Sequence, residues 1–301
     1  MKPLSPMKTA LFLTFLVVIW GVNWPLSKYA LTFAPPILFA GIRTLLGGVI
    51  LLFIALPRYR QLRFKETWHM YLISGVLNVV LFYGLQTVGL KYLPAGLFSA
   101  IVFLHPVLLG IFSWLWLGEE MFGLKVIGLL MGFVGVATIS ADGFTGQISL
   151  VGVLLALGCA LSWAVGTFYV KKISGSVDPV WLVTLQLIFG GVFMVCLGSE
   201  VESWHSIEWN TPFTLSLLFI SVFVIAIGWL VFFVLVGSGE ATKVASFTFL
   251  IPLVAIVSSV LFMHERITSN LLIGVILVAV SIFFVNVNRR ILVKKRATSK
   301  L

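Results

Sequence analysis

The side chains in this chain that could take part in chemistry are few, and several of them lie inside long apolar runs. Arg43 follows Pro35 by eight residues within the run 35–56, which is about 12 Å along a helix. A charge at that depth of a bilayer costs about 2.5–3.5 kcal/mol, so it is expected to face a partner or a water-filled cavity. We expect Arg43 to neutralise an anionic group such as a carboxylate. The alternative is an arginine held by backbone carbonyls at a broken helix.

One histidine lies near the middle of one of these runs, and histidine is the residue type that titrates near neutral pH. His105, next to Pro106, is a candidate for substrate contact or proton coupling, and a hydrogen-bonded packing role is the alternative. None of the Asp and Glu residues lies near the middle of an apolar run. The sequence therefore lacks the buried carboxylate with which small proton-driven drug exporters often exchange a proton for a cation.

Aromatic and amide side chains are concentrated in the same runs. Asn23 and Trp24 lie within about one helical turn of Trp20, and Pro25 frees backbone groups there. Freed backbone at membrane depth is tolerated only inside protein or beside a cavity. The alternative for the aromatic rings is simple packing. The candidates for a mixed polar and aromatic substrate pocket are Arg43, Asn23, Trp24, Asn78, Tyr83, Gln86, His105, Trp163, Gln186 and Trp229.

The elements that must position these residues are membrane-spanning helices. Hydrophobic residues make up 60% of the 301 positions, charged residues 10%, and the mean hydropathy is +1.13. Runs of about 20 apolar residues cross a hydrocarbon core of about 30 Å as helices, and these runs do not alternate as barrel strands do. The chain is therefore predicted to be an all-α polytopic membrane protein. Its ten transmembrane helices are expected at 9–29, 35–56, 68–88, 95–116, 124–140, 150–169, 179–198, 213–236, 242–262 and 269–288.

The second half of the chain repeats the first. Trp20 lies 143 positions before Trp163. Arg43 lies the same distance before Gln186. Because each half holds five predicted spans, an odd number, the second half would enter the membrane from the opposite side. The predicted organisation is two inverted five-helix repeats and a basic cytoplasmic tail, at 1–140, 150–288 and 289–301.

The distribution of basic residues predicts the orientation. With both termini cytoplasmic, 16 of the 20 Lys and Arg residues fall on the inner side and 3 on the outer side. This excess follows the positive-inside rule, and it explains the net charge of +10 without a nucleic-acid partner. We therefore expect a multi-pass protein of the cytoplasmic membrane. The first run shows no small-residue cleavage site, so it is expected to be a retained helix and not a signal peptide.

Sequence patterns for catalysis and for cofactor binding are absent. The chain has no Gly-rich phosphate loop, no ATP-binding motif, no HExxH motif and no buried carboxylate pair. Cys159 and Cys196 lie inside apolar spans without metal-ligand spacing and are expected to be small core residues. No enzymatic activity, cofactor or metal is predicted.

Small residues at helical spacing mark the fifth predicted span. Gly128, Gly132 and Gly135 lie on one face of 124–140, and such faces let helices approach closely in lipid. We interpret this face as packing that supports the repeat; a homodimer seam is the alternative. Glu119, just before this span, is expected to stabilise the positive N-terminal end of the same helix.

Several stretches together resemble the EamA-like family of the drug/metabolite transporter superfamily. In the first half they are WGVNWPLSKYA (20–30), LKYLPAGLFSAIVFLHPVL (90–108), WLGEE (116–120) and GLLMGFVGV (128–136). In the second half they are SWAVGTFYVKK (162–172) and GEATKVASFTFLIPLVAIVSSVLFMHERI (239–267). The resemblance covers nearly the entire chain.

This resemblance implies a carrier that mostly exports small metabolites, such as amino acids and their derivatives. It also implies a cavity formed by the first four helices of each repeat. We therefore predict a secondary transporter that works by alternating access, with a small-molecule substrate and the lipid bilayer as its partners. An uncoupled facilitator or channel, and a non-transporting regulatory or lipid-binding membrane component, remain the alternatives.

Overall fold

Helices make up all the regular structure in the computed structural model, which describes residues 4–93, 95–139, 149–254 and 269–286. Six helices in these ranges are long and apolar enough to cross a membrane: Pro6–Ala30, Pro36–Gln61, Phe64–Gly89, Leu150–Ile173, Pro179–Val201 and Thr211–Ser238. Four shorter apolar helices are His105–Trp116, Gly123–Thr138, Ala241–Val254 and Leu272–Asn286. The chain is an all-helical membrane protein, as its composition predicts.

Local signals in the first half explain where helices begin. The Ser5 hydroxyl accepts a hydrogen bond from Lys8 N and caps the first helix, and prolines open the first two helices, where their fixed φ fits. The elements are α1 (Pro6–Ala30), α2 (Pro36–Ala55), the 3₁₀ turn η1 (Leu56–Gln61), α3 (Phe64–Gly75), the π-helical turn η2 (Val76–Leu81), α4 (Phe82–Gly89), α5 (Ala95–Val102), α6 (His105–Trp116) and α7 (Gly123–Ile139).

Side-chain caps also start helices of the second half. Asp178 Oδ1 accepts from Val180 N at 3.0 Å, and Asn210 Oδ1 accepts from Phe213 N at 2.8 Å. The elements are α8 (Leu150–Ile173), α9 (Pro179–Val201), the 3₁₀ turn η4 (Trp204–Ser206), α10 (Thr211–Phe219), the π-helical turn η5 (Ile220–Ile227), α11 (Gly228–Ser238), α12 (Ala241–Ser246), the 3₁₀ turn η6 (Phe247–Leu250) and α14 (Ser269–Asn286).

The fourth expected span, 95–116, is two helices and not one. Phe103 N donates to Ser99 O at 2.9 Å in the turn between α5 and α6. Pro106 lies in the first turn of α6, where its missing N–H leaves no hydrogen bond unmade. His105 therefore lies at the start of α6, where one continuous helix was expected. The end of the ninth expected span, 255–262, and the tail 289–301 lie outside the described residues.

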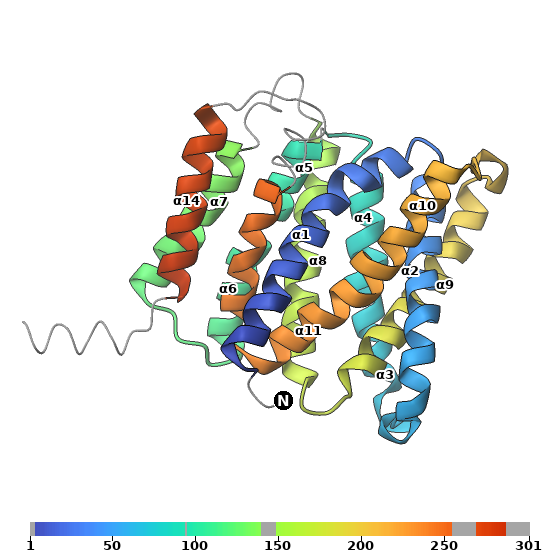
Figure 1. Cartoon of the computed structure of the whole chain (residues 1–301), viewed down its shortest axis with the longest axis horizontal. Helices are drawn as coiled ribbons and strands as arrows, with labels where there is room; N and C mark the ends of the chain where they lie inside the picture. The colour runs from blue at the N-terminus through green and yellow to red at the C-terminus, as the bar shows by residue number, and fades with distance from the viewer. Residues whose placement is uncertain (1–3, 94, 140–148, 255–268, 287–301) are drawn as a thin grey trace, which may run out of the picture.

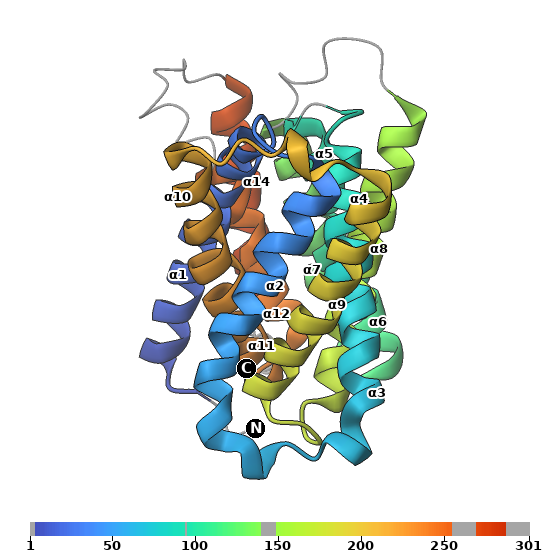
Figure 2. The ribbon, with the colours of Figure 1, turned by 90° about the vertical axis from the view of Figure 1, so that its right-hand side faces the viewer.

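Two helix pairs flank the bundle, α2 with α9 on one side and α7 with α14 on the other (Figures 1 and 2). In the first pair, the start of α2 lies at the end of α9. Ile37 N and Leu38 N donate to the Glu202 carboxylate at 3.0 and 2.8 Å, which satisfies two of the unpaired donors at the helix start. The two helices are therefore antiparallel.

The small-residue face of α7 packs against α14. A Cβ on Gly128 would lie 3.0 Å from Ser281 O, and a Cβ on Gly135 would lie 3.0 Å from Gly274 O. Such a close backbone approach requires glycine, and the order of the contacts shows that this pair is also antiparallel. The glycine face is covered by α14 within the chain, so it has the packing role that its spacing predicts.

The two π-helical turns η2 and η5 interrupt the third and eighth expected spans. A π turn shifts backbone carbonyls out of the regular α-helical pattern, and side chains of other helices bond to two of them. Ser162 Oγ on α8 donates to Leu77 O at 2.6 Å, and Trp20 Nε1 on α1 donates to Val224 O at 3.2 Å. These bonds fix α1 and α8 against the middle of the bundle.

Candidate functional site

Aromatic rings from several helices meet at the centre of the bundle. The Trp20 ring centroid lies 5.7 Å from that of Trp163 and 5.7 Å from that of Trp229. The Phe82 centroid lies 5.3 Å from that of Trp163. Tilted and T-shaped rings at these separations attract one another through their quadrupoles. Because the tryptophans belong to α1, α8 and α11, the cluster joins the two halves of the chain.

A small cavity lies within this cluster. It leaves about 30 Å³ for water-sized molecules, which is room for about two waters. A solute of metabolite size therefore enters only if the walls move. The lining residues are Trp20, Asn23, Trp24, Phe82, Tyr83, Gln86, Phe103, Trp163, Val224, Trp229 and Ile251.

Arg43 is fully buried behind one wall of the cavity. Its guanidinium lies between two rings, with Cζ 4.8 Å from the Phe39 centroid and 4.6 Å from the Tyr83 centroid. Nη1 donates to Ser27 Oγ at 3.0 Å and Nη2 to Gln86 Oε1 at 3.2 Å. A cation–π contact in a desolvated setting is worth about 2 kcal/mol. The two rings together thus offset the insertion cost of the charge.

The partners of Arg43 are side chains and not the backbone carbonyls of a broken helix. Among the residues that the structure describes, no carboxylate lies within 4.0 Å of the guanidinium, and Nε makes no hydrogen bond. The positive charge is therefore balanced by rings and neutral acceptors only. Arg43 does not line the cavity itself.

Two more hydrogen bonds extend this arrangement along the wall. Ser27 Oγ donates to Asn23 Oδ1 at 2.9 Å, so Arg43 is connected to Asn23 through one hydroxyl. Trp229 Nε1 donates to Tyr83 OH at 2.7 Å. Arg43 therefore touches or is linked to three of the polar residues that line the cavity.

His105 lies against Trp163 and outside the cavity lining. The two rings stack with centroids 3.8 Å apart and planes 10° apart. His105 Nε2 lies 3.5 Å from Thr167 Oγ1, and Nδ1 makes no hydrogen bond within the described part of the chain. In this conformation His105 fixes the plane of Trp163 and has no direct access to a solute.

Asn78 and Gln186 belong to a separate polar cluster. Ser74 Oγ donates to Gln186 Oε1, and Asn78 Nδ2 donates to Ser74 Oγ at 3.1 Å. The Asn78 amide packs directly against Gly166. This cluster connects the third span with α9 and α8, and it does not reach the cavity.

The structure thus divides the ten candidate residues into two groups. Asn23, Trp24, Tyr83, Gln86, Trp163 and Trp229 line the cavity, whereas Arg43, Asn78, His105 and Gln186 do not. The lining residue Trp20 was missed, although its spacing from Asn23 and its match with Trp163 were available signals. The other missed lining residues are apolar residues in apolar spans, which carry no such signal: Phe82, Phe103, Val224 and Ile251.

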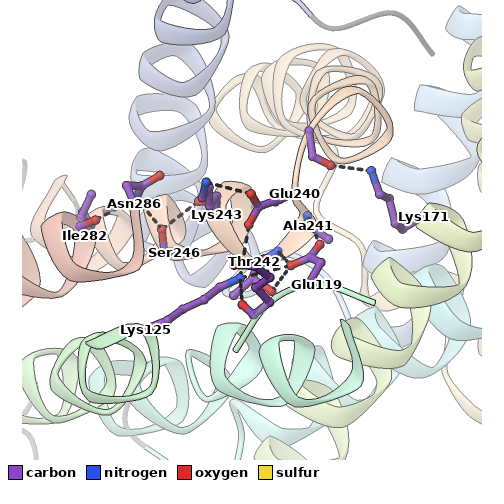
Figure 3. A network of polar contacts seen from close by, with 12 residues as sticks. Glu119, Lys125, Lys171, Glu240, Ala241, Thr242, Lys243, Ser246, Ile282 and Asn286 are labelled. Carbon is purple, nitrogen blue, oxygen red and sulfur yellow. Dashed lines mark hydrogen bonds and ion pairs between the residues drawn. The ribbon is translucent and has the colours of Figure 1, made fainter. Parts of the chain in front are cut away.

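A network of charged residues joins the two halves at one end of the bundle (Figure 3). Lys125 Nζ, on a side chain only 1% exposed, lies 3.5 Å from Glu119 Oε2 and 3.3 Å from Glu240 Oε2. Lys243 Nζ lies 2.8 Å from Glu240 Oε1. Burial opposes ionisation of Glu240, but the two lysines outweigh it and hold the pKa of this carboxyl below its usual value. We call these four residues the ionic network.

Glu119 also caps a helix of the other half. Its Oε1 accepts from Ala241 N at 2.6 Å, and its Oε2 accepts from Thr242 Oγ1 at 2.6 Å and from Thr242 N at 3.3 Å. The expectation that Glu119 stabilises the fifth helix is therefore wrong, because it caps α12 instead. Lys171 Nζ donates to Val236 O at 2.9 Å. This bond holds the end of α11, just before the start of α12 that Glu119 caps (Figure 3).

Comparison with known proteins identifies the family. The model of the EamA-like transporter family matches residues 7–141 and again residues 150–287. The chain belongs to the EamA-like transporter family. The uncharacterized transporter YvbV of Bacillus subtilis (strain 168) is 64% identical over 286 residues, which cover 95% of this chain and 94% of YvbV.

More distant relatives agree with this assignment. The probable amino-acid metabolite efflux pump of Escherichia coli (strain K12) is 27% identical over 299 residues, which cover 92% of this chain and 94% of the pump. A protein of known crystal structure matches the fold with a TM-score of 0.81 at 18% identity, over 94% of this chain and 97% of its own. The family resemblance seen in the sequence is confirmed. This EamA-family protein is a multi-pass membrane transporter and not an enzyme.

Proposed function

We propose that this EamA-family protein is a secondary transporter that exports small amphipathic metabolites, such as amino acids and their derivatives, by alternating access. The observation that carries the proposal is a central cavity with aromatic walls and a few polar groups, lined from both halves of the chain. Small-molecule sites have this composition, and transporters built from two related halves bind their solute where the halves meet. The similarity to a probable amino-acid metabolite efflux pump supports the solute range.

Two inverted five-helix repeats, 1–140 and 150–288, would place this cavity at their interface. Helices at matching places in inverted repeats run in opposite directions. The antiparallel pairs α2 with α9 and α7 with α14 support this inversion, since each pair joins matching helices of the two halves. The π turns η2 and η5 also take matching places, in the third and eighth spans.

The ionic network would lie at the cytoplasmic end of the molecule. The excess of basic residues favours a cytoplasmic-membrane orientation with both termini inside, and Lys125 and Lys243 belong to that side. Glu119 and Lys125 come from the first half, whereas Glu240 and Lys243 come from the second. The network must therefore separate before the cavity can open to the cytoplasm. In this proposed role, the same four residues of the ionic network form what we call the inner gate.

Reconstitution in liposomes tests the proposal. Proteoliposomes loaded with a pooled mixture of unlabelled metabolites are expected to take up labelled amphipathic solutes by counterflow, and the uptake is expected to saturate. Asn23→Leu replaces a polar lining group with an apolar one of similar size, so exchange is expected to slow. Protein-free liposomes are the control.

The same preparation separates the alternatives. Uptake that ignores an imposed proton or sodium gradient would favour an uncoupled facilitator over a coupled secondary transporter. Failure to exchange any solute, with the protein folded and inserted, would contradict the proposal and favour a non-transporting membrane component.

A further inference from the structure

The orientation of Gln86 is determined by Arg43. A guanidinium has hydrogen-bond donors only, so the Gln86 amide must turn its oxygen toward Arg43 Nη2, which lies 3.2 Å away. The Gln86 NH₂ group is then directed away from Arg43. No hydrogen bond among the described residues uses this group, and Gln86 lines the cavity.

The same logic orients Asn23. Ser27 Oγ accepts the Arg43 Nη1 hydrogen at 3.0 Å, so its own hydrogen is free to be donated. It is donated to Asn23 Oδ1, 2.9 Å away. Asn23 is therefore held by its oxygen, and its NH₂ group makes no hydrogen bond within the described chain. Arg43 thus fixes two amides that line the cavity.

Two further lining groups are also donors. Tyr83 OH accepts the hydrogen of Trp229 Nε1, which leaves the phenol hydrogen available. Trp163 Nε1 has no hydrogen-bond partner in the part of the chain that is described. Together with the two amides, the phenol gives the cavity wall unused donors from Asn23, Tyr83 and Gln86, whereas the Trp163 N–H is buried in this conformation.

The main acceptors on the same walls each already receive one hydrogen bond from the protein. Val224 O accepts from Trp20 Nε1, and the oxygens of Asn23 and Gln86 accept from Ser27 and Arg43. The lining contains no Asp or Glu. An ammonium group in the cavity would find a buried guanidinium nearby and no carboxylate, and an unpaired buried charge is costly.

We propose that the cavity selects apolar, above all aromatic, monocarboxylates that carry no free amino group, and that Arg43 is a positioning residue for this selection. Arg43 does not bind the carboxylate; it holds Asn23 and Gln86 so that their NH₂ groups face it. Donors to a carboxylate form charge-assisted hydrogen bonds, and the tryptophan and phenylalanine walls pack on an aromatic body. This inference rests on the proposed transport function and narrows its solute range to derivatives without an amine.

Equilibrium binding of three matched probes to the full chain in nanodiscs tests the inference. 3-Phenylpropanoate, phenylalanine and 2-phenylethylamine share one ring and differ only in which charged groups they carry. An unpaired buried charged group weakens binding by about 10- to 100-fold. We therefore expect 3-phenylpropanoate to bind at least about tenfold more tightly than phenylalanine, and 2-phenylethylamine to bind most weakly.

Gln86→Glu separates recognition from stability. The variant keeps the side-chain size and gives Arg43 an anionic partner, so its thermal stability is expected to equal or exceed that of the parent. It replaces the NH₂ donor with an oxygen acceptor. Affinity for 3-phenylpropanoate is expected to fall about 100-fold, and affinity for 2-phenylethylamine is expected to rise. Asn286→Asp makes the same amide-to-acid change on α14, outside the cavity, and is expected to leave all three affinities unchanged.

Arg43→Lys separates positioning from charge. Lysine keeps the positive charge but lacks the planar fork that reaches Ser27 and Gln86 together. Affinity for 3-phenylpropanoate is expected to fall, and the preference over phenylalanine to shrink. Unchanged affinity in this variant would overturn the positioning role. An unchanged probe order in Gln86→Glu, or equal or no binding of the three probes to the parent, would overturn the solute class.

Counterflow of labelled 3-phenylpropanoate in proteoliposomes distinguishes this inference from the transport proposal. Binding in the expected order without counterflow would support the site and contradict transport. Counterflow of other solutes with no preference for 3-phenylpropanoate would contradict the solute class and support transport.

Discussion

Replacing Glu119 by glutamine is expected to weaken the inner gate. The carboxylate accepts three hydrogen bonds from the start of α12, at 2.6, 2.6 and 3.3 Å, and it lies 3.5 Å from Lys125. Glutamine keeps one acceptor oxygen and places an NH₂ group where the second oxygen stood. That NH₂ group would face the backbone or hydroxyl donors of Ala241 or Thr242.

The size of the effect follows from these contacts. A hydrogen bond to a charged group contributes about 1.5–3 kcal/mol, so losing one and weakening the others costs about 3 kcal/mol. In the proposed alternating-access cycle the contacts join the two halves only while the gate is closed, so the cost falls on the closed state alone. At about 1.4 kcal/mol per tenfold, the closed-to-open ratio changes on the order of 100-fold. Lys125 keeps Glu240, 3.3 Å away, so the gate is weakened and not abolished.

Accessibility of the cavity from the cytoplasmic side measures this shift. A Trp24→Cys reporter on the cavity wall, in a background with Cys159→Ala and Cys196→Ala, is labelled in inside-out vesicles with a membrane-impermeant maleimide. Glu119→Gln is expected to raise the labelling rate by up to about 100-fold. Lys125→Met, which removes the shared cation, is expected to raise it as well.

Glu66→Gln is the matched control, because it removes a carboxylate that is 70% exposed and, among the described residues, is paired only with Arg63 at 3.6 Å. Exposed pairs of this kind contribute about 0–1 kcal/mol, so the rate should stay near that of the parent. The reasoning about the inner gate would be refuted if Glu119→Gln and Lys125→Met, both folded by size-exclusion chromatography, were labelled no faster than Glu66→Gln.

Two other predictions concern stability. Gly132→Ala would place a Cβ 2.5 Å from Ser281 Oγ and against the Phe249 ring, so it is expected to cost about 1–3 kcal/mol and to lower the unfolding temperature in detergent. Gly123→Ala, where nothing lies within 4 Å, should leave that temperature nearly unchanged; equal shifts would contradict the close packing of α7 on α14. The lowered pKa of Glu240 means that its ion pairs stabilise the fold fully above the ordinary value of 4.5 and lose that contribution as the pH falls through the lower folded value. The unfolding temperature of Glu240→Gln is therefore expected to fall less than that of the parent when the pH is lowered from about 5 to about 3. Equal falls in the two proteins would show that the ion pairs of Glu240 contribute nothing to stability.

The ends of the long helices could be predicted because apolar runs stop at prolines and charged residues. The run 35–56 corresponds to α2 (Pro36–Ala55), and 179–198 begins where α9 (Pro179–Val201) begins. The break before His105 had no comparable signal. A proline one residue on is compatible with a kinked helix as well as with the first turn of a new one. The π turns likewise occur in ordinary apolar sequence.

Partners across the bundle could not be predicted, because they depend on which helices pack together. The depth of Arg43 predicted a buried charge that needs partners, but Gln86, one of those partners, lies 43 positions away. Glu119 was assigned to the helix that follows it in sequence. It caps α12 instead, through Ala241, which lies 122 positions further along the chain. Local sequence determines that a charged residue lies next to a helix end. Tertiary packing determines which helix its side chain caps.

Matching positions in the two halves have different surroundings. Trp20 and Trp163 are 143 positions apart, yet only Trp20 has a hydrogen-bond partner for its indole, in Val224 O of the π turn η5. The other π turn, η2, offers Leu77 O, but the hydroxyl of Ser162, next to Trp163, already donates to it. The Trp163 indole N–H is therefore left without a hydrogen-bond partner in the described part of the chain.

The two halves also differ in the charge that they place near the centre of the bundle. The first half has Arg43, whereas the matching position of the second half has the neutral Gln186, which is bonded to Ser74 outside the cavity. An arginine at both positions would put two like charges in the bilayer interior, each with its own desolvation cost. One arginine can be balanced by two rings and two neutral acceptors, as the structure shows. The character of the cavity therefore depends on the residues at which the halves differ.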